Sequence, residues 1–176
     1  MNTQKLTQKC IEAISRAQGI AREYGNQQLQ QAHFLLALIE QEEGIARELI
    51  KKCGARPEEM ADRLRLIIDR YPKISGDADS LYLSAAADKA LREAERLAEE
   101  MKDEYVLVEH ILLGIVNTAD RDIKELLDRS GIDKHGLLSA LKDIRGNRRV
   151  ISDRGYLQRL KKVRLGPRRA GTGAKT

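Results

Sequence analysis

Residues 33–39 read His-Phe-Leu-Leu-Ala-Leu-Ile and residues 110–116 read His-Ile-Leu-Leu-Gly-Ile-Val, so one pattern occurs twice, 77 positions apart. The same shift aligns the flanking sequence without a gap and places Leu6 on Leu83 and Gly54 on Gly131. A fixed internal period is the signature of a repeat architecture. The sequence therefore predicts a duplicated unit, with repeat one at about 1–75 and repeat two at about 80–150.

The spacing of apolar residues within each copy is typical of helices. From Cys10 to Ala21 they recur at steps of three and four, which predicts a helix over residues 7–24 with Thr7 as its N-cap. Similar patterns predict four helices in each copy, and Ser84 is expected to cap the first helix of repeat two. We expect an all-α fold of eight helices, arranged as two tandem four-helix repeats. The second helix of each repeat is nearly all apolar and cannot be buried by one small unit alone, so we expect the two repeats to pack as one domain.

The net charge of +5 arises from 32 Lys and Arg residues against 27 Asp and Glu residues. Residues 154–176 contain eight of the basic residues and no acidic one, which leaves 24 basic and 27 acidic residues in the rest of the chain. The body is therefore mildly acidic and carries a basic tail. Aromatic residues make up only 3% of the chain and Trp is absent, which argues against a stacking platform for single-stranded nucleic acid.

Several other classes are disfavoured by the composition. No apolar run approaches the roughly 20 residues of a membrane-spanning helix, so no membrane partner is expected. Cys10 and Cys53 form neither a C-x-x-C pair nor a disulfide framework, which favours a cytoplasmic location. His33 and His110 each stand at the start of an apolar helix, where a hydrogen-bonded structural histidine is the simplest interpretation. No catalytic constellation, metal or cofactor is predicted.

Several motifs at matching spacing resemble the Clp repeat, and most closely the N-terminal domain of ClpB, a bacterial AAA+ protein disaggregase. They are the two histidine-led apolar helices, Leu6-Thr7-Gln8-Lys9, the stretch from Asp103 to His110, and Gly146-Asn147-Arg148-Arg149-Val150. The ClpC branch also has two such repeats. The resemblance covers residues 1 to about 153 and does not extend to an ATPase module, so it implies a non-catalytic domain.

The resemblance implies a stress-response chaperone domain that captures unfolded or aggregated polypeptide in a shallow hydrophobic groove beside the junction of the two repeats. The positions that match the family's substrate contacts are Thr7, Leu91, Leu97, Asp103, Glu109 and His110. Asp103 and Glu109 are expected to lie at the edge of a groove whose floor consists of leucine side chains. The pattern alone favours core positions for Leu91 and Leu97 and a capping role for Thr7. The alternative function is a stand-alone regulator or adaptor that docks on Clp ATPase rings.

The chain departs from the family pattern at two helix starts. Gln30-Gln31-Ala32 replaces the usual Asp-Pro-Glu, and Leu107 stands where a serine often caps the helix. Each change is expected to weaken local capping by about 1 kcal/mol.

Residues 151–176 depart more strongly, because Arg, Gly and Pro follow Leu160-Lys161-Lys162 where the family has a Leu-Lys-Lys-Tyr-Gly linker. One hypothesis is a reading-frame slip just after Asp153, since codons exist for residues 154–176 that spell a linker-like sequence one nucleotide later. The nucleotide sequence from the Asp153 codon onward tests it. The rival interpretation is a tail that is disordered or partly helical and touches nucleic acid or anionic lipid through its basic residues.

Overall fold

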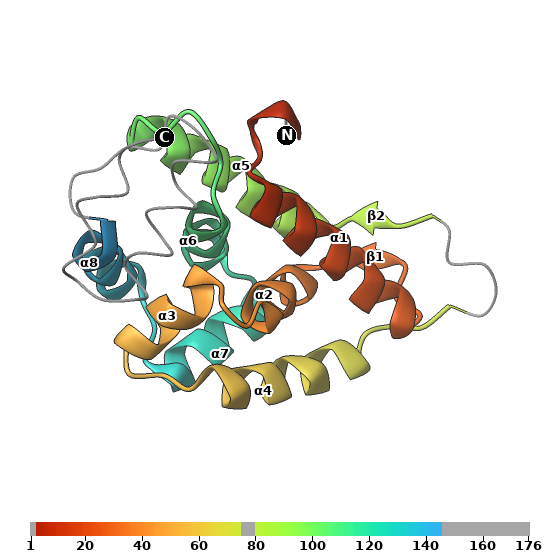
Figure 1. Cartoon of the computed structure of the whole chain (residues 1–176). Coiled ribbons are helices and arrows are strands. Elements are labelled where there is room, and N and C mark those ends of the chain that lie inside the picture. The colour runs from red at the N-terminus through yellow and green to blue at the C-terminus, as the bar shows by residue number, and fades with distance from the viewer. Residues whose placement is uncertain (1–2, 75–79, 146–176) are drawn as a thin grey trace.

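The computed structural model describes residues 3–74 and 80–145 (Figure 1). Eight α-helices occur in these ranges, which confirms the predicted all-α fold. In chain order the elements are η1 (Thr3–Lys5), α1 (Gln8–Glu23), β1 (Gln28–Leu29), α2 (Gln31–Glu40), α3 (Ile45–Lys52), α4 (Pro57–Asp69), β2 (Tyr82–Leu83), α5 (Ala85–Glu100), α6 (Val108–Thr118), α7 (Arg121–Ser130) and α8 (Lys134–Arg145). The domain boundary near residue 150 and the tail over 151–176 lie outside the described residues.

The helices begin and end where local sequence signals place them. Thr7 is the N-cap of α1, and its Oγ1 accepts a hydrogen bond from the backbone N–H of Cys10 at 3.3 Å. Ser84 caps α5 in the same way, accepting from the N–H of Ala87 at 3.1 Å. Gly131 ends α7 with a φ of 73°, a left-handed conformation that glycine adopts without a steric penalty. The predicted caps at Thr7 and Ser84 are therefore confirmed.

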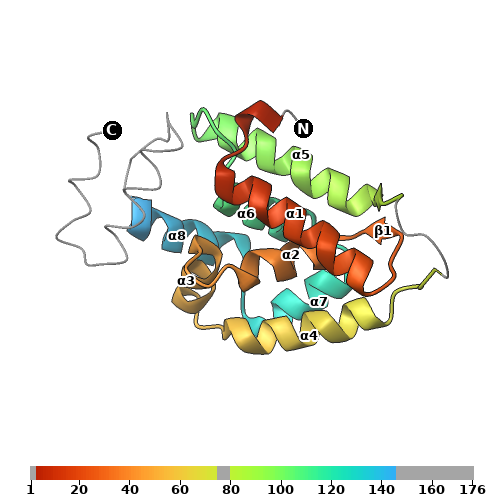
Figure 2. The same cartoon turned by 45° about the vertical axis from the view of Figure 1, so that its right-hand side comes forward.

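The apolar helices α2 and α6 form the centre of the molecule. They contact each other, while α1 packs on α2 and α5 packs on α6 (Figures 1 and 2). A Cβ atom added to Gly114 of α6 would lie 2.3 Å from the carbonyl oxygen of Ala90 on α5. Glycine at this position therefore sets the close spacing of α5 and α6.

The two repeats also exchange short extended segments. Leu6, just before α1, forms a parallel bridge with Val106, in the loop before α6. In β1 and β2, Leu29 pairs with Leu83 in the same parallel sense. A shift of 77 positions converts one pair into the other. The segment before the first helix of each repeat therefore pairs with a loop of the other repeat, which ties the two copies into one domain. These short strands were not predicted.

Gln31, at the start of α2, is a buried polar link between the repeats. Its Nε2 donates to the carbonyl oxygens of Ala86 at 2.9 Å and Thr118 at 3.1 Å. Its Oε1 accepts from the N–H of Asp120 at 2.9 Å. Gln31, one of the residues that depart from the family pattern, therefore joins repeat one to three segments of repeat two.

Candidate functional site

Four of the six predicted site residues meet around the loop that joins α5 to α6. The backbone N–H of Thr7 donates to the carbonyl oxygen of Val106 at 3.2 Å, which brings the start of α1 against this loop. Asp103 lies within the loop, and Glu109 and His110 lie in the first turn of α6. All four residues are buried. The structure therefore brings these four residues into the interior beside one loop, although the Thr7 hydroxyl accepts from Cys10 of its own helix.

The acidic side chains of this cluster surround Arg145, at the end of α8. Its Nη2 donates to Oδ1 of Asp103 at 2.5 Å, and its Nη1 lies 4.0 Å from Oε2 of Glu109. The side chains of Asp103 and Glu109 have no exposed surface, so their carboxylates are turned inward and do not edge an open groove in this structure. Arg145 was missed at the sequence level because nothing in the sequence marks a partner more than 30 residues away along the chain.

His110 completes the cluster as a structural histidine. Its Nδ1 accepts from the backbone N–H of Leu107 at 2.8 Å, and its Nε2 lies 3.0 Å from Oδ2 of Asp103. Because Nδ1 is an acceptor, the proton of the neutral ring is on Nε2 and is donated to the carboxylate. The imidazole thus accepts the backbone N–H of the N-cap residue of α6, which is the half of a capping box that the N3 side chain supplies.

His33 repeats this arrangement in the first copy. Its Nδ1 accepts from the N–H of Gln30 at 2.9 Å, and its Nε2 lies 2.9 Å from Oδ1 of Asn26. Burial lowers the pKa of His33 to about 4, so the ring is neutral at pH 7. The structural interpretation is therefore confirmed for His33 and His110. Within residues 3–74 and 80–145, no group of three or more His, Cys, Asp or Glu side chains is arranged to hold a metal ion.

The two predicted leucines differ in their surroundings. Leu97, in the last turns of α5, is only 2% exposed and belongs to the core. Leu91 is half-buried, and the six-residue spacing places it roughly 9 Å nearer the N-terminal end of α5 than Leu97. Leu91 packs partly against the core and is therefore the one predicted site residue that is not fully buried.

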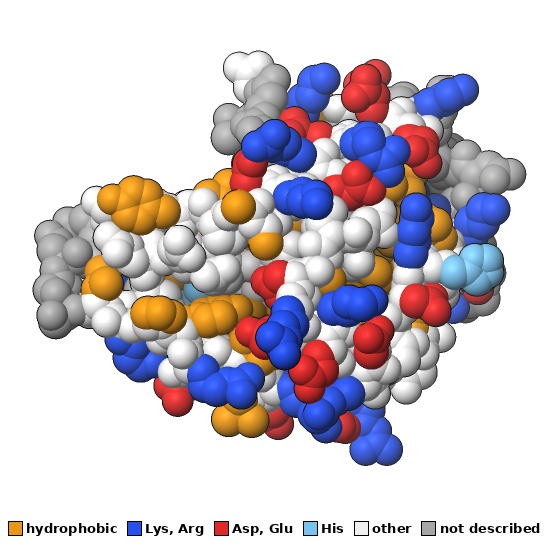
Figure 3. Space-filling view, turned by 180° about the vertical axis from the view of Figure 1, so that it is seen from behind, with side chains coloured by type: hydrophobic (Ala, Val, Ile, Leu, Met, Phe, Trp, Pro, Cys, Tyr) orange, Lys and Arg blue, Asp and Glu red, His pale blue; other side chains and the backbone are white. Residues whose placement is uncertain are grey.

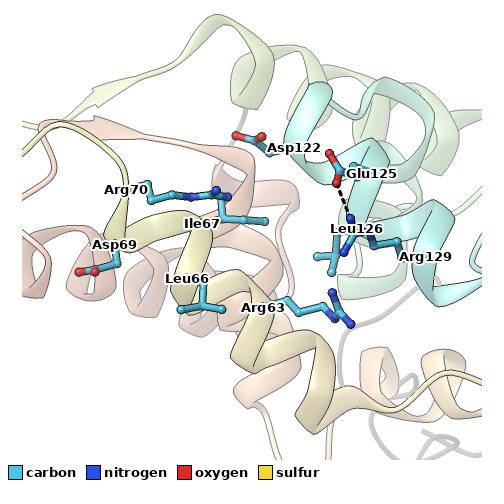
Figure 4. Close-up of a pocket in the computed structure, with 9 residues that line it drawn as sticks. All are labelled: Arg63, Leu66, Ile67, Asp69, Arg70, Asp122, Glu125, Leu126 and Arg129. Carbon is cyan, nitrogen blue, oxygen red and sulfur yellow. Dashed lines mark ion pairs between the residues drawn. The ribbon is translucent and has the colours of Figure 1, made fainter.

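A groove that was not predicted lies between α4 of repeat one and α7 of repeat two (Figure 4). Its volume is about 490 Å³. Leu66, Ile67 and Leu126 supply its apolar surface, and Leu66 is 67% exposed. Charged side chains of both signs surround them, namely Arg63, Arg70, Arg129, Asp69, Asp122 and Glu125, of which Arg129 and Glu125 form an ion pair at 3.1 Å.

One feature of the sequence could have indicated this groove. The buried side of α4 follows Met60, Leu64, Ile67 and Ile68, and Leu66 lies off that stripe. A large apolar residue on the polar side of an amphipathic helix is a candidate for a contact outside the domain.

The exposed apolar surface is not spread evenly. On the face seen in Figure 3, hydrophobic side chains gather toward one end, and charged side chains of both signs cover much of the rest. The large exposed hydrophobic residues among those described are Ile11, Leu66, Tyr82 and Leu83. None of the described helices has the length and hydropathy of a membrane span.

Comparison with known proteins assigns the chain to a family. Residues 5–147 match the family model described as the Clp repeat N-terminal domain. The chain belongs to the Clp repeat N-terminal domain family. The chaperone protein ClpB of Clostridium tetani is 33% identical over 153 residues, which cover 85% of this chain and 18% of that protein. The chain thus corresponds to the N-terminal domain of a much longer relative.

Solved structures of Clp N-domains have the same fold. The Hsp104 N-terminal domain from Candida albicans is 25% identical, with a TM-score of 0.75 over 85% of this chain and 97% of that one. A complex of the ClpV N-domain with a VipB peptide contains a chain that is 19% identical, with a TM-score of 0.60 over 78% of this chain and 89% of that one. The predicted Clp repeat and chaperone-domain assignments are therefore confirmed.

Proposed function

We propose that this Clp N-domain captures unfolded or aggregated polypeptide, weakly and reversibly, for a ClpB-type disaggregase. The observation that carries the proposal is the α4–α7 groove, where Leu66 lies 67% exposed at the junction of the repeats. An apolar surface that lies in a groove and is rimmed by charged side chains is typical of a binding site. The ClpV N-domain, which has the same fold, is known in complex with a peptide.

The family-derived site enters this proposal in two ways. We assign Leu91 a direct contact with the captured chain because it is the one residue of the six that is not buried. We assign Thr7, Leu97, Asp103, Glu109 and His110 a positioning role, because they are buried and hold α1, α5 and α6 together.

The size of the apolar contacts suits weak capture. Burying a whole leucine side chain is worth about 1.5–3 kcal/mol, so covering the exposed two-thirds of Leu66 is worth roughly 1–2 kcal/mol. Association costs about 4–15 kcal/mol in lost freedom, so several such contacts are needed for any binding. A surface with only a few such contacts therefore binds weakly and releases its ligand readily. A domain that passes polypeptides onward requires such release.

The experiment measures the fluorescence anisotropy of labelled α-lactalbumin, kept unfolded by reduction and carboxymethylation, as the full chain is added. Leu66→Asp should weaken binding by about fivefold or more, since it loses about 1 kcal/mol of apolar contact and gains a charge to desolvate. Leu91→Asp should weaken binding by a smaller factor, because less of its side chain is exposed. Ser139→Asp, on the exposed side of α8, adds the same charge elsewhere and should bind as the parent does. Absence of binding by the parent chain refutes the proposal.

The second candidate function is docking on Clp ATPase rings as a regulator. The observation that favours it is the mixed charge around the α4–α7 groove, with three basic and three acidic side chains, because a specific partner can match such a pattern. Co-purification of the full chain with ClpB hexamers, lost on reversal of Arg63 and Arg129 to Glu, supports this function. Binding of unfolded α-lactalbumin without co-purification favours the first.

A further inference from the structure

The short strand β2 has a backbone edge that its partner strand does not use. The N–H of Tyr82 donates to the carbonyl oxygen of Gln27 at 2.9 Å, and that of Ser84 donates to Leu29 at 3.0 Å. Successive residues in a strand direct their N–H and C=O groups to opposite edges. The register with β1 therefore leaves the N–H and C=O of Leu83 facing away from β1.

The side chains on this edge are apolar. Tyr82 is 57% exposed and Leu83 is 42% exposed, and they are neighbours in sequence, so they stand on opposite faces of the strand. An added strand would meet an apolar side chain on either face. Proteins usually protect a free edge with a charge, a proline or a covering segment, and Tyr82 and Leu83 supply neither a charge nor a proline.

The repeat provides an internal comparison. Leu6 is the counterpart of Leu83, and its bridge to Val106 has the same geometry, with the N–H of Thr7 donating to Val106 at 3.2 Å. Leu6 is only 8% exposed, against 42% for Leu83. The same structural position is therefore covered in repeat one and open in repeat two. β2 lies at the end of the molecule away from α8 (Figure 1).

We infer that the free edge of β2 binds an extended apolar stretch of unfolded polypeptide by strand addition, an inference that rests on the proposed function. A helix satisfies its backbone groups internally, whereas an extended chain supplies both an acceptor for the Leu83 N–H and a donor for its C=O. Backbone pairing accepts any sequence, and Tyr82 and Leu83 add a preference for β-branched and aromatic residues.

Amide hydrogen exchange, followed by NMR on the full chain, tests this mode directly. The probe is an eight-residue peptide of alternating valine and threonine, and the control peptide has proline in place of two valines. At a peptide concentration ten times Kd, exchange of the Leu83 amide should slow by about tenfold, because it exchanges only from the free form. The amides of Tyr82 and Ser84 already bond to repeat one and serve as the reference. Unchanged exchange at Leu83 overturns the inference.

A pair of variants separates backbone pairing from apolar contact. Leu83→Pro removes the outward N–H and leaves the β1–β2 bonds donated by Tyr82 and Ser84 in place, so peptide affinity should fall about fivefold, the effect of one backbone hydrogen bond. Leu83→Ala keeps the N–H and should keep its protection by the peptide. Affinity of a folded Leu83→Pro variant equal to the parent overturns the inference. If that variant does not fold, the exchange result on the parent decides.

The outcome also distinguishes this inference from the proposed function. Binding of unfolded α-lactalbumin with no protection of the Leu83 amide refutes strand addition and leaves capture by the α4–α7 groove. Absence of binding to the peptide and to α-lactalbumin refutes both.

Discussion

The close approach of α5 to α6 makes Gly114→Ala a strong test of the packing. The new Cβ would lie 2.3 Å from the carbonyl oxygen of Ala90 and 3.0 Å from the backbone nitrogen of Ala94. Both atoms belong to the backbone, so the helices must separate by about 1 Å to reach an ordinary contact distance in a densely packed interior. Overpacking of this kind costs about 3 kcal/mol, and the better helix propensity of alanine returns about 1 kcal/mol. The net loss of unfolding free energy is about 2 kcal/mol.

The assay is thermal unfolding followed by circular dichroism. For a chain of this size, 2 kcal/mol corresponds to a fall in Tm of about 4–8 °C. Gly19→Ala in α1 is the matched control, because its Cβ would lie 3.7 Å from the flexible side chain of Arg16. That change should raise Tm by about 1–4 °C, since alanine only restricts the unfolded chain. A Gly114→Ala variant as stable as the Gly19→Ala variant would refute the spacing of α5 and α6.

Three further predictions concern buried polar groups. Arg145→Met should lower the free energy of unfolding in urea by about 3–5 kcal/mol, because two buried carboxylates lose their guanidinium partner, whereas Arg92→Met on the exposed side of α5 should have little effect. Gln31→Ala should cost about 1–3 kcal/mol in the same assay through its lost links to repeat two, and the exposed Gln28→Ala should be near neutral. Burial lowers the pKa of His33 to about 4, so the unfolded chain gains a proton that the folded chain does not as pH falls from about 6.5 to 4, and His33 should then account for a loss of roughly 3 kcal/mol of stability. An NMR titration of the ring checks this, and a midpoint near 6.5 would contradict it.

Features encoded within a few residues were predictable from the sequence. The 77-residue shift and the helical periodicity gave the repeat and the helices, and the caps at Thr7 and Ser84 are confirmed because an N-cap depends only on the first turn of its own helix. The family resemblance led to the loop around Asp103, where four of the six expected residues do meet.

Features that depend on distant contacts were not predictable. Arg145 reaches Asp103 across 42 positions, and no local pattern marks that pair. The β1–β2 pair has two residues in each strand, too few for an alternating pattern. Gln31 was expected only to weaken capping, since its links to repeat two follow from the packing of the whole domain. The burial of Asp103 and Glu109 depends on the same packing.

The central claim is that this Clp N-domain selects unfolded polypeptide. The most direct measurement compares its binding to labelled α-lactalbumin in the native form and in the reduced, carboxymethylated form. The account predicts saturable binding to the unfolded form alone, weakened by Leu66→Asp and unaffected by Ser139→Asp. Equal binding to both forms, or none to either, would contradict it.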